Sequence, residues 1–160
     1  MRRLIVVMGV SGCGKSTLGH QLADRMKTIF IEADDYHSDA NIKKMSAGTP
    51  LDDADRADWI KSIVKKVDQI PDDEIVLACS ALTPFVQKEL LSVSNREIVW
   101  LYLEVDKRDL LHRLQTRDHF MPATLLESQY EALSVPANAV RLDGSLPLGE
   151  LTDAVIAHLA

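Results

Sequence analysis

The residues best suited to chemistry lie near the N-terminus, where a glycine-rich turn ends in a lysine and a serine. The segment Gly9-Val10-Ser11-Gly12-Cys13-Gly14-Lys15-Ser16 matches the pattern G-x-x-x-x-G-K-[ST] at every specified position. An apolar run precedes it and an amphipathic run follows it, which is the strand, loop and helix context that the motif requires. Glycines let backbone amides converge on an anion, and a helix N-terminus adds positive potential. The segment therefore predicts a site for the phosphates of a nucleotide.

Two side chains of this loop have predictable roles. The ammonium of Lys15 would contact the β- and γ-phosphates, and the hydroxyl of Ser16 would bind Mg²⁺. Thr17 follows as a further predicted contact to the nucleotide. Cys13 occupies a variable position and is expected to be a passive small residue instead of a redox group. The loop thus predicts ATP and Mg²⁺ as ligands.

The acidic partner of the metal must be sought outside the usual place. The apolar run that ends at Cys79 has no carboxylate at its end, and the sequence has no Asn-Lys-x-Asp motif for reading guanine. Carboxylates do follow the run Ile29–Ile31, at Glu32, Asp34 and Asp35. Because parallel strands end at one edge of a sheet, these acids should lie beside the loop. The acidic partner of the metal is therefore expected among these carboxylates.

Short apolar runs alternate with helical periods along the chain, which is typical of an α/β fold. The expected strands are Leu4–Met8, Ile29–Ile31, Ile75–Cys79, Ile98–Leu103 and Ala139–Leu142. One helix is expected to follow Lys15 and another to end near Ile70. A third should begin after an N-cap at Asp106, and two more should cover Leu125–Leu133 and Leu148–Leu159. We predict a single P-loop kinase domain over residues 1–160, with three layers and five parallel strands. A helical insertion is expected at about 38–70.

Composition limits the partners and the compartment. The chain has 160 residues and a net charge of −6, so a polyanionic nucleic acid is not expected as a partner. Two cysteines are too few for a disulfide framework. The first apolar run ends at Gly9, which fits neither a signal peptide nor a membrane span of about 20 residues. We therefore expect a cytoplasmic protein without a membrane partner.

Several segments of the chain resemble the gluconate kinase (gluconokinase) family, in the order in which that family has them. In the first half they are Asp34-Asp35-Tyr36-His37, Asn41-Ile42-Lys43-Lys44-Met45, Gly48-Thr49-Pro50-Leu51-Asp52-Asp53-Ala54-Asp55-Arg56 and Trp59. In the second half they are Cys79-Ser80-Ala81-Leu82, Arg113-Leu114-Gln115-Thr116-Arg117, His119-Phe120-Met121 and Leu125-Leu126-Glu127-Ser128-Gln129-Tyr130. The stretch from Asp34 to Trp59 is specific, whereas the phosphate loop alone is not.

The resemblance implies an enzyme that transfers the γ-phosphoryl group of ATP to D-gluconate and yields 6-phospho-D-gluconate. It implies a fold like that of nucleoside and shikimate kinases, in which the insertion at about 38–70 binds substrate and a small lid covers about 117–124. It also implies a small sugar acid as substrate, dependence on Mg²⁺, and a homodimer as one assembly state. It also assigns residues. Asp34 falls on the family's acidic position and would contact the acceptor hydroxyl and a water of the metal shell, with a turn aspartate as the alternative. His37, Arg56 and Ser80 would join it around the acceptor, with the guanidinium fork of Arg56 for the carboxylate. Arg113 would contact ATP, and Arg117 would reach the transferred group from the lid.

Some of these residues could have a purely structural role instead. Arg56 could form a surface salt bridge with a nearby aspartate, Arg113 could pair with Asp109 on its own helix, and Ser80 could serve the turn alone. Trp59 and Cys79 are expected in the core.

The chain also departs from the family pattern. Gluconate kinases usually have a lysine at the position of Thr83 and a Tyr-Arg pair at Val86-Gln87. These changes leave the ATP machinery intact but leave open a different aldonate or hydroxy acid as the acceptor, as in a shikimate-kinase-like enzyme. A nucleotide-binding regulator without turnover is the other alternative.

Overall fold

Strands and helices alternate along the chain in this computed structural model, which describes residues 1–116 and 125–160. The strands are β1 (Arg3–Met8), β2 (Ile29–Glu32), β3 (Glu74–Ala78), β4 (Glu97–Glu104) and β5 (Val140–Asp143). The helices are α1 (Lys15–Met26), the 3₁₀ helix η1 (Ala33–Tyr36), α2 (Asp39–Ser46), α3 (Asp53–Gln69), α4 (Pro84–Leu91), α5 (Lys107–Thr116), α6 (Leu126–Ala132) and α7 (Leu148–Leu159). The predicted lid at 117–124 lies outside the described residues.

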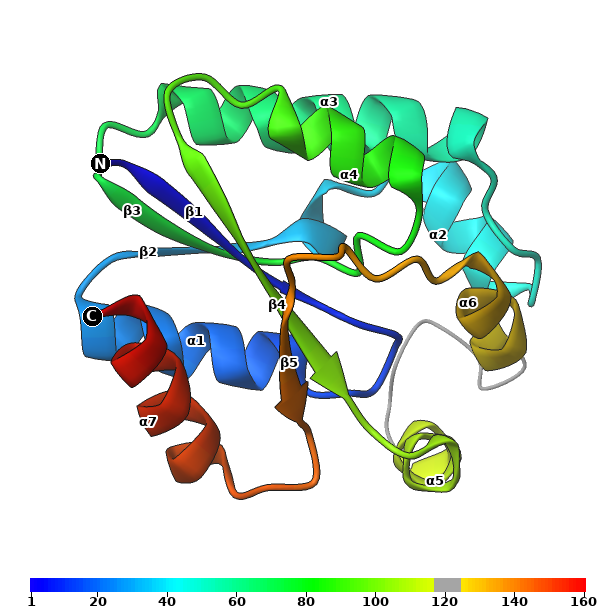
Figure 1. Cartoon of the computed structure of the whole chain (residues 1–160). Coiled ribbons are helices and arrows are strands. Elements are labelled where there is room, and N and C mark those ends of the chain that lie inside the picture. Colours follow the sequence, from blue (N-terminus) through cyan, green and yellow to red (C-terminus); the bar gives the residue numbers. More distant parts are fainter. Residues whose placement is uncertain (117–124) are drawn as a thin grey trace.

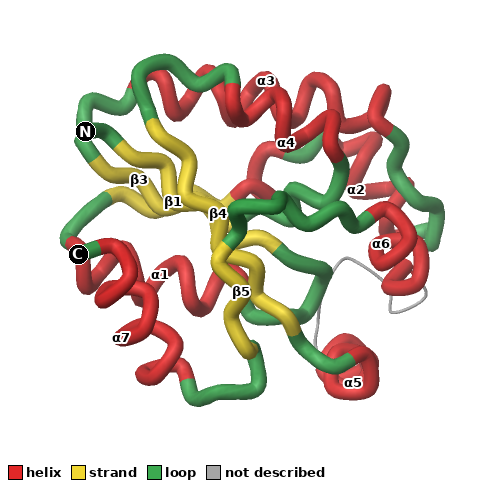
Figure 2. Tube along the Cα trace, viewed as in Figure 1, coloured by secondary structure: helices red, strands yellow, loops and turns green. Residues whose placement is uncertain are grey.

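The five strands form one parallel sheet in the order β2-β3-β1-β4-β5, which confirms the predicted fold class. Figures 1 and 2 show the sheet between two groups of helices, with α3 and α4 on one face and α1 and α7 on the other. Both chain ends lie on the side of the sheet away from α2 and α6. The carboxyl ends of the strands therefore face the region where α2 and α6 approach each other.

Alternation along β1 explains why this strand is almost entirely apolar. Leu4, Val6 and Met8 pack in the cluster that contains α3 and α4, whereas Ile5 and Val7 pack in the cluster that contains α1, α5 and α7. A strand covered on both faces has no polar side to present to water. The central strand is thus held in place by both layers, and the loop that follows it starts from a rigid support.

Local capping sets where the helices next to this edge begin. Asp52 caps α3 by accepting the N–H of Asp55, and the Asp55 side chain accepts the N–H of Asp52 in return. This reciprocal pair is a capping box. Asp106 accepts the N–H of Arg108 at the start of α5, which confirms the predicted N-cap. The alternation of strands and helices predicted a helix between β3 and β4 without assigning its residues; that helix is α4, which begins at Pro84 behind a Thr83 cap.

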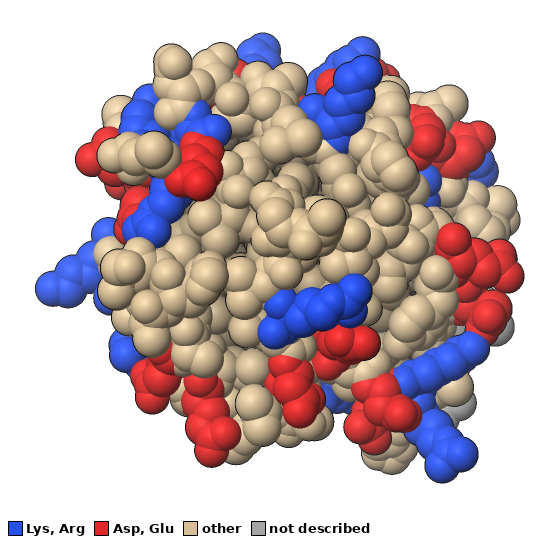
Figure 3. Space-filling view, in the orientation of Figure 1, with Lys and Arg blue, Asp and Glu red and all other residues tan. Residues whose placement is uncertain are grey.

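Charged side chains of both signs are interspersed around the face in Figure 3, and the middle of that face is mostly uncharged. Within residues 1–116 and 125–160, none of the helices combines the length and the apolar character needed to span a bilayer.

Candidate active site

One cavity of about 180 Å³ lies beyond the carboxyl ends of the strands. The phosphate loop and α1 form one wall with Ser11, Gly12, Gly14, Lys15, Ser16 and Thr17. The remaining walls come from Asp34, His37, Met45, Pro50, Leu51, Arg56, Trp59, Ser80, Leu82, Leu125, Ser128, Gln129 and Ala132. The cavity therefore joins the predicted nucleotide loop to elements from four other parts of the chain.

The backbone of the phosphate loop has the conformation that its glycines allow. Gly14 has φ +100° and precedes α1 directly, so no side chain caps the first amides of that helix. Gly9 has φ +149°, and a Cβ there would lie 2.9 Å from the carbonyl oxygen of Leu103. The Lys15 ammonium donates to the Val10 carbonyl at 3.2 Å. The loop thus presents uncapped helix amides and a lysine at the cavity, the arrangement that binds phosphates.

Glu32 is one of the carboxylates expected beside the loop, although the predicted metal role was assigned to Asp34. The Ser16 hydroxyl donates to one oxygen of the Glu32 carboxylate, and the other oxygen accepts the N–H of Asp34 at 3.4 Å. Burial raises the pKa of Glu32, with the nearby Asp34 charge acting in the same direction. The signal was present in the sequence, because Glu32 directly follows an apolar run that ends at the same sheet edge as the loop. Glu32 is therefore the carboxylate closest to the predicted metal ligand Ser16.

Asp34 lies in η1 and lines the cavity together with Lys15, so the two residues face one cleft. Its side chain is 40% exposed, and Oδ1 lies 4.0 Å from Nε2 of His37. Desolvation lowers the pKa of His37, which keeps its ring neutral at pH 7. Nδ1 of His37 is buried and has no hydrogen-bond partner among the described residues. Asp34 is thus accessible to a ligand, as a general base or orienting acceptor must be.

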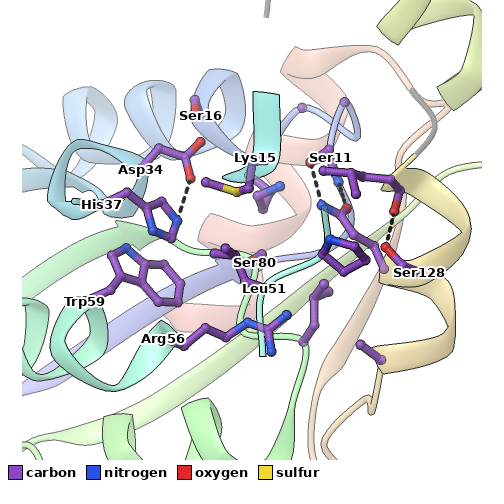
Figure 4. A pocket seen from close by; sticks show the side chains of 18 of the residues that line it. Ser11, Lys15, Ser16, Asp34, His37, Leu51, Arg56, Trp59, Ser80 and Ser128 are labelled. Atoms are coloured by element: carbon purple, nitrogen blue, oxygen red, sulfur yellow. Dashed lines mark hydrogen bonds and ion pairs between the residues drawn. The ribbon is translucent and has the colours of Figure 1, made fainter. Parts of the chain in front are cut away.

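Trp59 lies below His37 in Figure 4 and supports it. The indole ring stacks on the His37 ring with centroids 4.4 Å apart, and Nε1 donates to the Ala33 carbonyl at 2.7 Å. The residue is buried, which confirms the predicted core position, and its edge also lines the cavity. The tryptophan therefore ties α3 to the turn that carries Asp34.

Arg56 enters the cavity from the first turns of α3, opposite the phosphate loop (Figure 4). Its Nη1 lies 3.3 Å from Oδ1 of Asp53, and its side chain is 18% exposed. The alternative of a salt bridge with a neighbouring aspartate is therefore correct, and the same side chain nevertheless lines the cavity. A guanidinium has five N–H donors, so one pairing leaves others for a ligand.

Thr83 and Gln87, which depart from the family pattern, both make structural contacts. The Thr83 hydroxyl donates to Asp53 at 3.2 Å and accepts the N–H of Val86 at 3.3 Å. The Gln87 amide donates to the carbonyls of Ala81 and Ser134. These neutral residues hold the turn between β3 and α4 without adding positive charge to the cavity.

That turn brings Ser80 to the cavity, as predicted. The Ser80 carbonyl accepts the N–H of Gly9 at 3.4 Å, which links the end of β3 to the phosphate loop. Ala81 follows with φ +46°, an uncommon conformation for a residue with a side chain. Cys79 is buried beneath the turn, and desolvation raises the pKa of its thiol to about 12, so the predicted buried position is confirmed.

The far wall belongs to α6, and Gln129 is a site residue to which the sequence analysis gave no role. Its Oε1 accepts the N–H of Ser11 at 2.7 Å, and its Nε2 donates to the Ser11 hydroxyl at 3.0 Å. Arg113 lies behind the loop, where Nη1 donates to the carbonyls of Gly12 and Cys13. The side chains of α5 and α6 thus grip the phosphate loop from two sides.

The structure gathers most of the predicted site residues but not all of them. Ser11, Gly12, Gly14, Lys15, Ser16, Thr17, Asp34, His37, Arg56 and Ser80 line the cavity. Val10 and Cys13 are buried within the loop, and Gly9 packs against β4. Arg117 and His119 lie outside the described residues. Among the residues described, no group of three or more His, Cys, Asp or Glu side chains could hold a metal alone.

Comparisons with known proteins show similarity to kinases. The shikimate kinase family model matches residues 11–138. The gluconokinase of Gluconobacter oxydans is 38% identical over 98% of this chain and 90% of the relative. The family match covers the phosphate loop from Ser11 onward and the acceptor side of the cavity.

Solved structures give the same result for the fold. A sugar kinase from Janibacter sp. HTCC2649 superimposes with a TM-score of 0.91 at 34% identity, covering 99% of this chain and 95% of that one. A gluconokinase from Sinorhizobium meliloti 1021 gives 0.85 at 36% identity, covering 100% and 95%. A kinase of this kind uses ATP as co-substrate and an alcohol group as acceptor. The chain therefore belongs to the gluconokinase family, within the group of P-loop kinases that the shikimate kinase model describes.

Proposed function

We propose that this protein phosphorylates a small sugar acid with ATP, and that D-gluconate, giving 6-phospho-D-gluconate, is its substrate. One observation carries the proposal. Lys15 and Ser16 of the phosphate loop line the same cavity as Asp34 and Arg56. A donor phosphate and an acceptor that carries both a hydroxyl and a carboxylate can therefore meet there. Phosphoryl transfer needs little beyond such positioning and compensation of charge.

The reaction assigns one task to each side chain. Arg56 holds the acceptor carboxylate through a guanidinium fork, while His37 and Ser80 border the hydroxyl groups. Asp34 orients the terminal hydroxyl and accepts its proton as the oxygen forms a bond to the γ-phosphorus. The bond from that phosphorus to the β-phosphate oxygen breaks, and Lys15 stabilises the charge on the phosphates. We assign Arg113 to ATP and Arg117 to the transferred group.

The residues around Ser16 suit a Mg²⁺ ion that arrives with the nucleotide. Mg²⁺ is usually bound by one or two protein oxygens together with phosphates and water. The Ser16 hydroxyl fits the position of a direct ligand, and the carboxylates of Glu32 and Asp34 fit the surrounding water shell. When bound, the ion neutralises charge on the phosphate oxygens. Before that, Glu32 keeps the Ser16 hydroxyl oriented by accepting its hydrogen bond.

A related acceptor is the second candidate, favoured by Thr83 and Gln87. Their side chains are neutral and already engaged with Asp53 and with backbone carbonyls. An aldonate of different length, or another hydroxy acid, would meet the same Arg56 and the same Asp34.

A coupled assay of ADP release tests both candidates. The purified protein is given ATP, Mg²⁺ and a panel that contains D-gluconate, other aldonates, shikimate and nucleoside monophosphates. Turnover with D-gluconate at the highest kcat/KM supports the proposal. Turnover with a nucleotide and with none of the acids would overturn it, and a preference for another acid would shift the assignment to the second candidate.

A further inference from the structure

Asp53 holds two hydrogen bonds on a single carboxylate oxygen. Oδ1 accepts from Nη1 of Arg56 at 3.3 Å and from Oγ1 of Thr83 at 3.2 Å. Asp53 and Arg56 share the first turns of α3, three residues apart, whereas Thr83 comes from the turn after β3. One oxygen therefore joins the helix that supplies Arg56 to a different wall of the cavity.

The Thr83 hydroxyl is held in this orientation by a second bond. It accepts the N–H of Val86 as the N-cap of α4, and the residue is only 9% exposed. A hydroxyl has one proton to donate. With its lone pair directed to α4, that proton is directed to Asp53. Thr83 is thus an anchored donor, in contrast to a flexible surface serine or threonine.

Arg56 gains most from such an anchor. An arginine loses substantial rotamer freedom when it is ordered, and a ligand that must order it binds less tightly. The Arg56 side chain is 18% exposed and lines the cavity, and Asp53 is 52% exposed. A carboxylate so open to water restrains the guanidinium without burying its charge. The Arg56 side chain is therefore oriented before a ligand binds, and its positive charge faces the cavity.

We infer that Asp53 and Thr83 are positioning residues that orient Arg56 for the acceptor carboxylate. The link also fastens α3 to the turn that carries Ser80 and Leu82 into the cavity. The hydrogen bonds from Thr83 and Arg56 to Asp53 thus set the distance between two walls of the acceptor site. The positioning of Arg56 does not depend on which substrate binds, and only the nature of its ligand rests on the proposed function.

Three variants and a matched control test this inference. Thr83→Val removes the hydroxyl at nearly constant volume, Thr83→Ser retains it, and Asp53→Ala removes the shared carboxylate while the Asp52 cap of α3 remains. Asp58→Ala is the control, because Asp58 is an exposed aspartate of the same helix outside the cavity lining. We expect Thr83→Val and Asp53→Ala to raise KM for the sugar acid about tenfold, since each weakens a bond to a charged group. KM for ATP should stay within about twofold in every variant, because the phosphate loop is untouched.

A second readout needs no substrate. The rate at which phenylglyoxal modifies Arg56, followed by mass spectrometry, should rise severalfold in Thr83→Val and Asp53→Ala. Thr83→Ser and Asp58→Ala should react as the unaltered protein does. If Thr83→Val does not fold, as judged by circular dichroism, Asp53→Ala carries the test because it leaves the α4 cap in place. Unchanged KM for the acid and unchanged Arg56 reactivity in a folded variant would overturn the inference. Failure of the unaltered protein to use any sugar acid would instead overturn the proposed function, and the modification rates would still decide the positioning role.

Discussion

At the scale of single residues, the site depends on side chains whose surroundings set their charge. Glu32 and His37 are both desolvated, with opposite consequences: burial raises the pKa of the carboxyl and lowers that of the imidazole. Both shifts favour the neutral form of the group. Glu32 nevertheless keeps hydrogen bonds from Ser16 and from the backbone of Asp34, which suit the ionised form. The fold therefore holds the Glu32 carboxylate where a metal ion bound with the nucleotide would stabilise its negative charge.

Glu32→Gln should lower the activity of the protein and raise its stability in the absence of nucleotide. The raised pKa means that the contribution of Glu32 to stability is complete below its unfolded value of 4.5 and is lost as the pH rises through the folded value. Without nucleotide, the variant should therefore have the higher Tm at pH 7, and the difference should vanish near pH 4. Turnover should fall about 10- to 100-fold, as for other residues that orient a metal ligand. Thermal scans between pH 4 and pH 8 check the sign, and a Tm difference that grows on acidification would contradict it.

Arg56→Ala should separate acceptor binding from nucleotide binding. Loss of a charged, forked contact to a carboxylate is expected to raise KM for the acid about 10- to 100-fold, with KM for ATP nearly unchanged. Steady-state kinetics with each substrate varied in turn measure the split. Arg25→Ala is the control, since Arg25 forms an exposed pair with Asp153 on the surface. Equal increases in both KM values would argue against contact between Arg56 and the carboxylate.

At the scale of elements, α3 both covers the sheet and supports the catalytic turn. Ile60, Ile63 and Val67 bury its apolar face against the strands. Trp59, one residue before Ile60, reaches the carbonyl of Ala33 at the start of η1. A helix whose packing is dictated by the core thus helps to position Asp34, through the Trp59 hydrogen bond to Ala33 and the Trp59 ring stacked on His37.

Trp59→Phe should weaken this connection without emptying the core. The buried Ala33 carbonyl would lose its partner, which costs about 1–3 kcal/mol of unfolding free energy. Urea unfolding measures that loss, and kinetics should show a lower kcat because Asp34 is less well placed. Trp100→Phe is the matched control: Trp100 is equally buried in the same cluster but comes from β4, away from η1. A kcat loss of the same size in both variants would assign the effect to packing alone.

At the scale of the whole molecule, the nucleotide loop is continuous with the central strand of the sheet. β1 pairs with β3 and β4 and is covered on both faces, and α1 follows the loop directly. A ligand bound there is coupled to the native state as a whole. Binding should consequently be visible in global stability as well as in turnover.

Lys15→Ala should lose both signals together. For the unaltered protein, ATP and Mg²⁺ at a hundred times Kd should stabilise the native state by about 2.7 kcal/mol, which corresponds to a Tm increase of about 5–11 °C for a chain of this size. The variant should fold with a similar Tm alone, show little ATP-dependent increase and have no measurable turnover. Thermal scans with and without ATP provide the test. A full Tm increase with normal kcat would remove Lys15 from the mechanism.

Most of the fold and half of the site could be derived from the residues alone. Apolar runs covered on both faces predict parallel strands, and the glycine pattern before Lys15 predicts the phosphate loop, because both are local consequences of residue type. The order of strands and helices then places Asp34 at the same sheet edge as that loop. The family resemblance added Arg56 and the acceptor.

Only the tertiary structure decided the contacts that cross between elements. Glu32 joins Ser16 from the neighbouring wall, Gln129 reaches the phosphate loop from α6, and Thr83 meets Asp53 from a turn thirty residues away. No local pattern encodes such pairs, since each depends on how separate helices dock on the sheet. The sequence by itself determined which chemistry this chain carries, and the packing of its layers determined which side chains hold that chemistry in position.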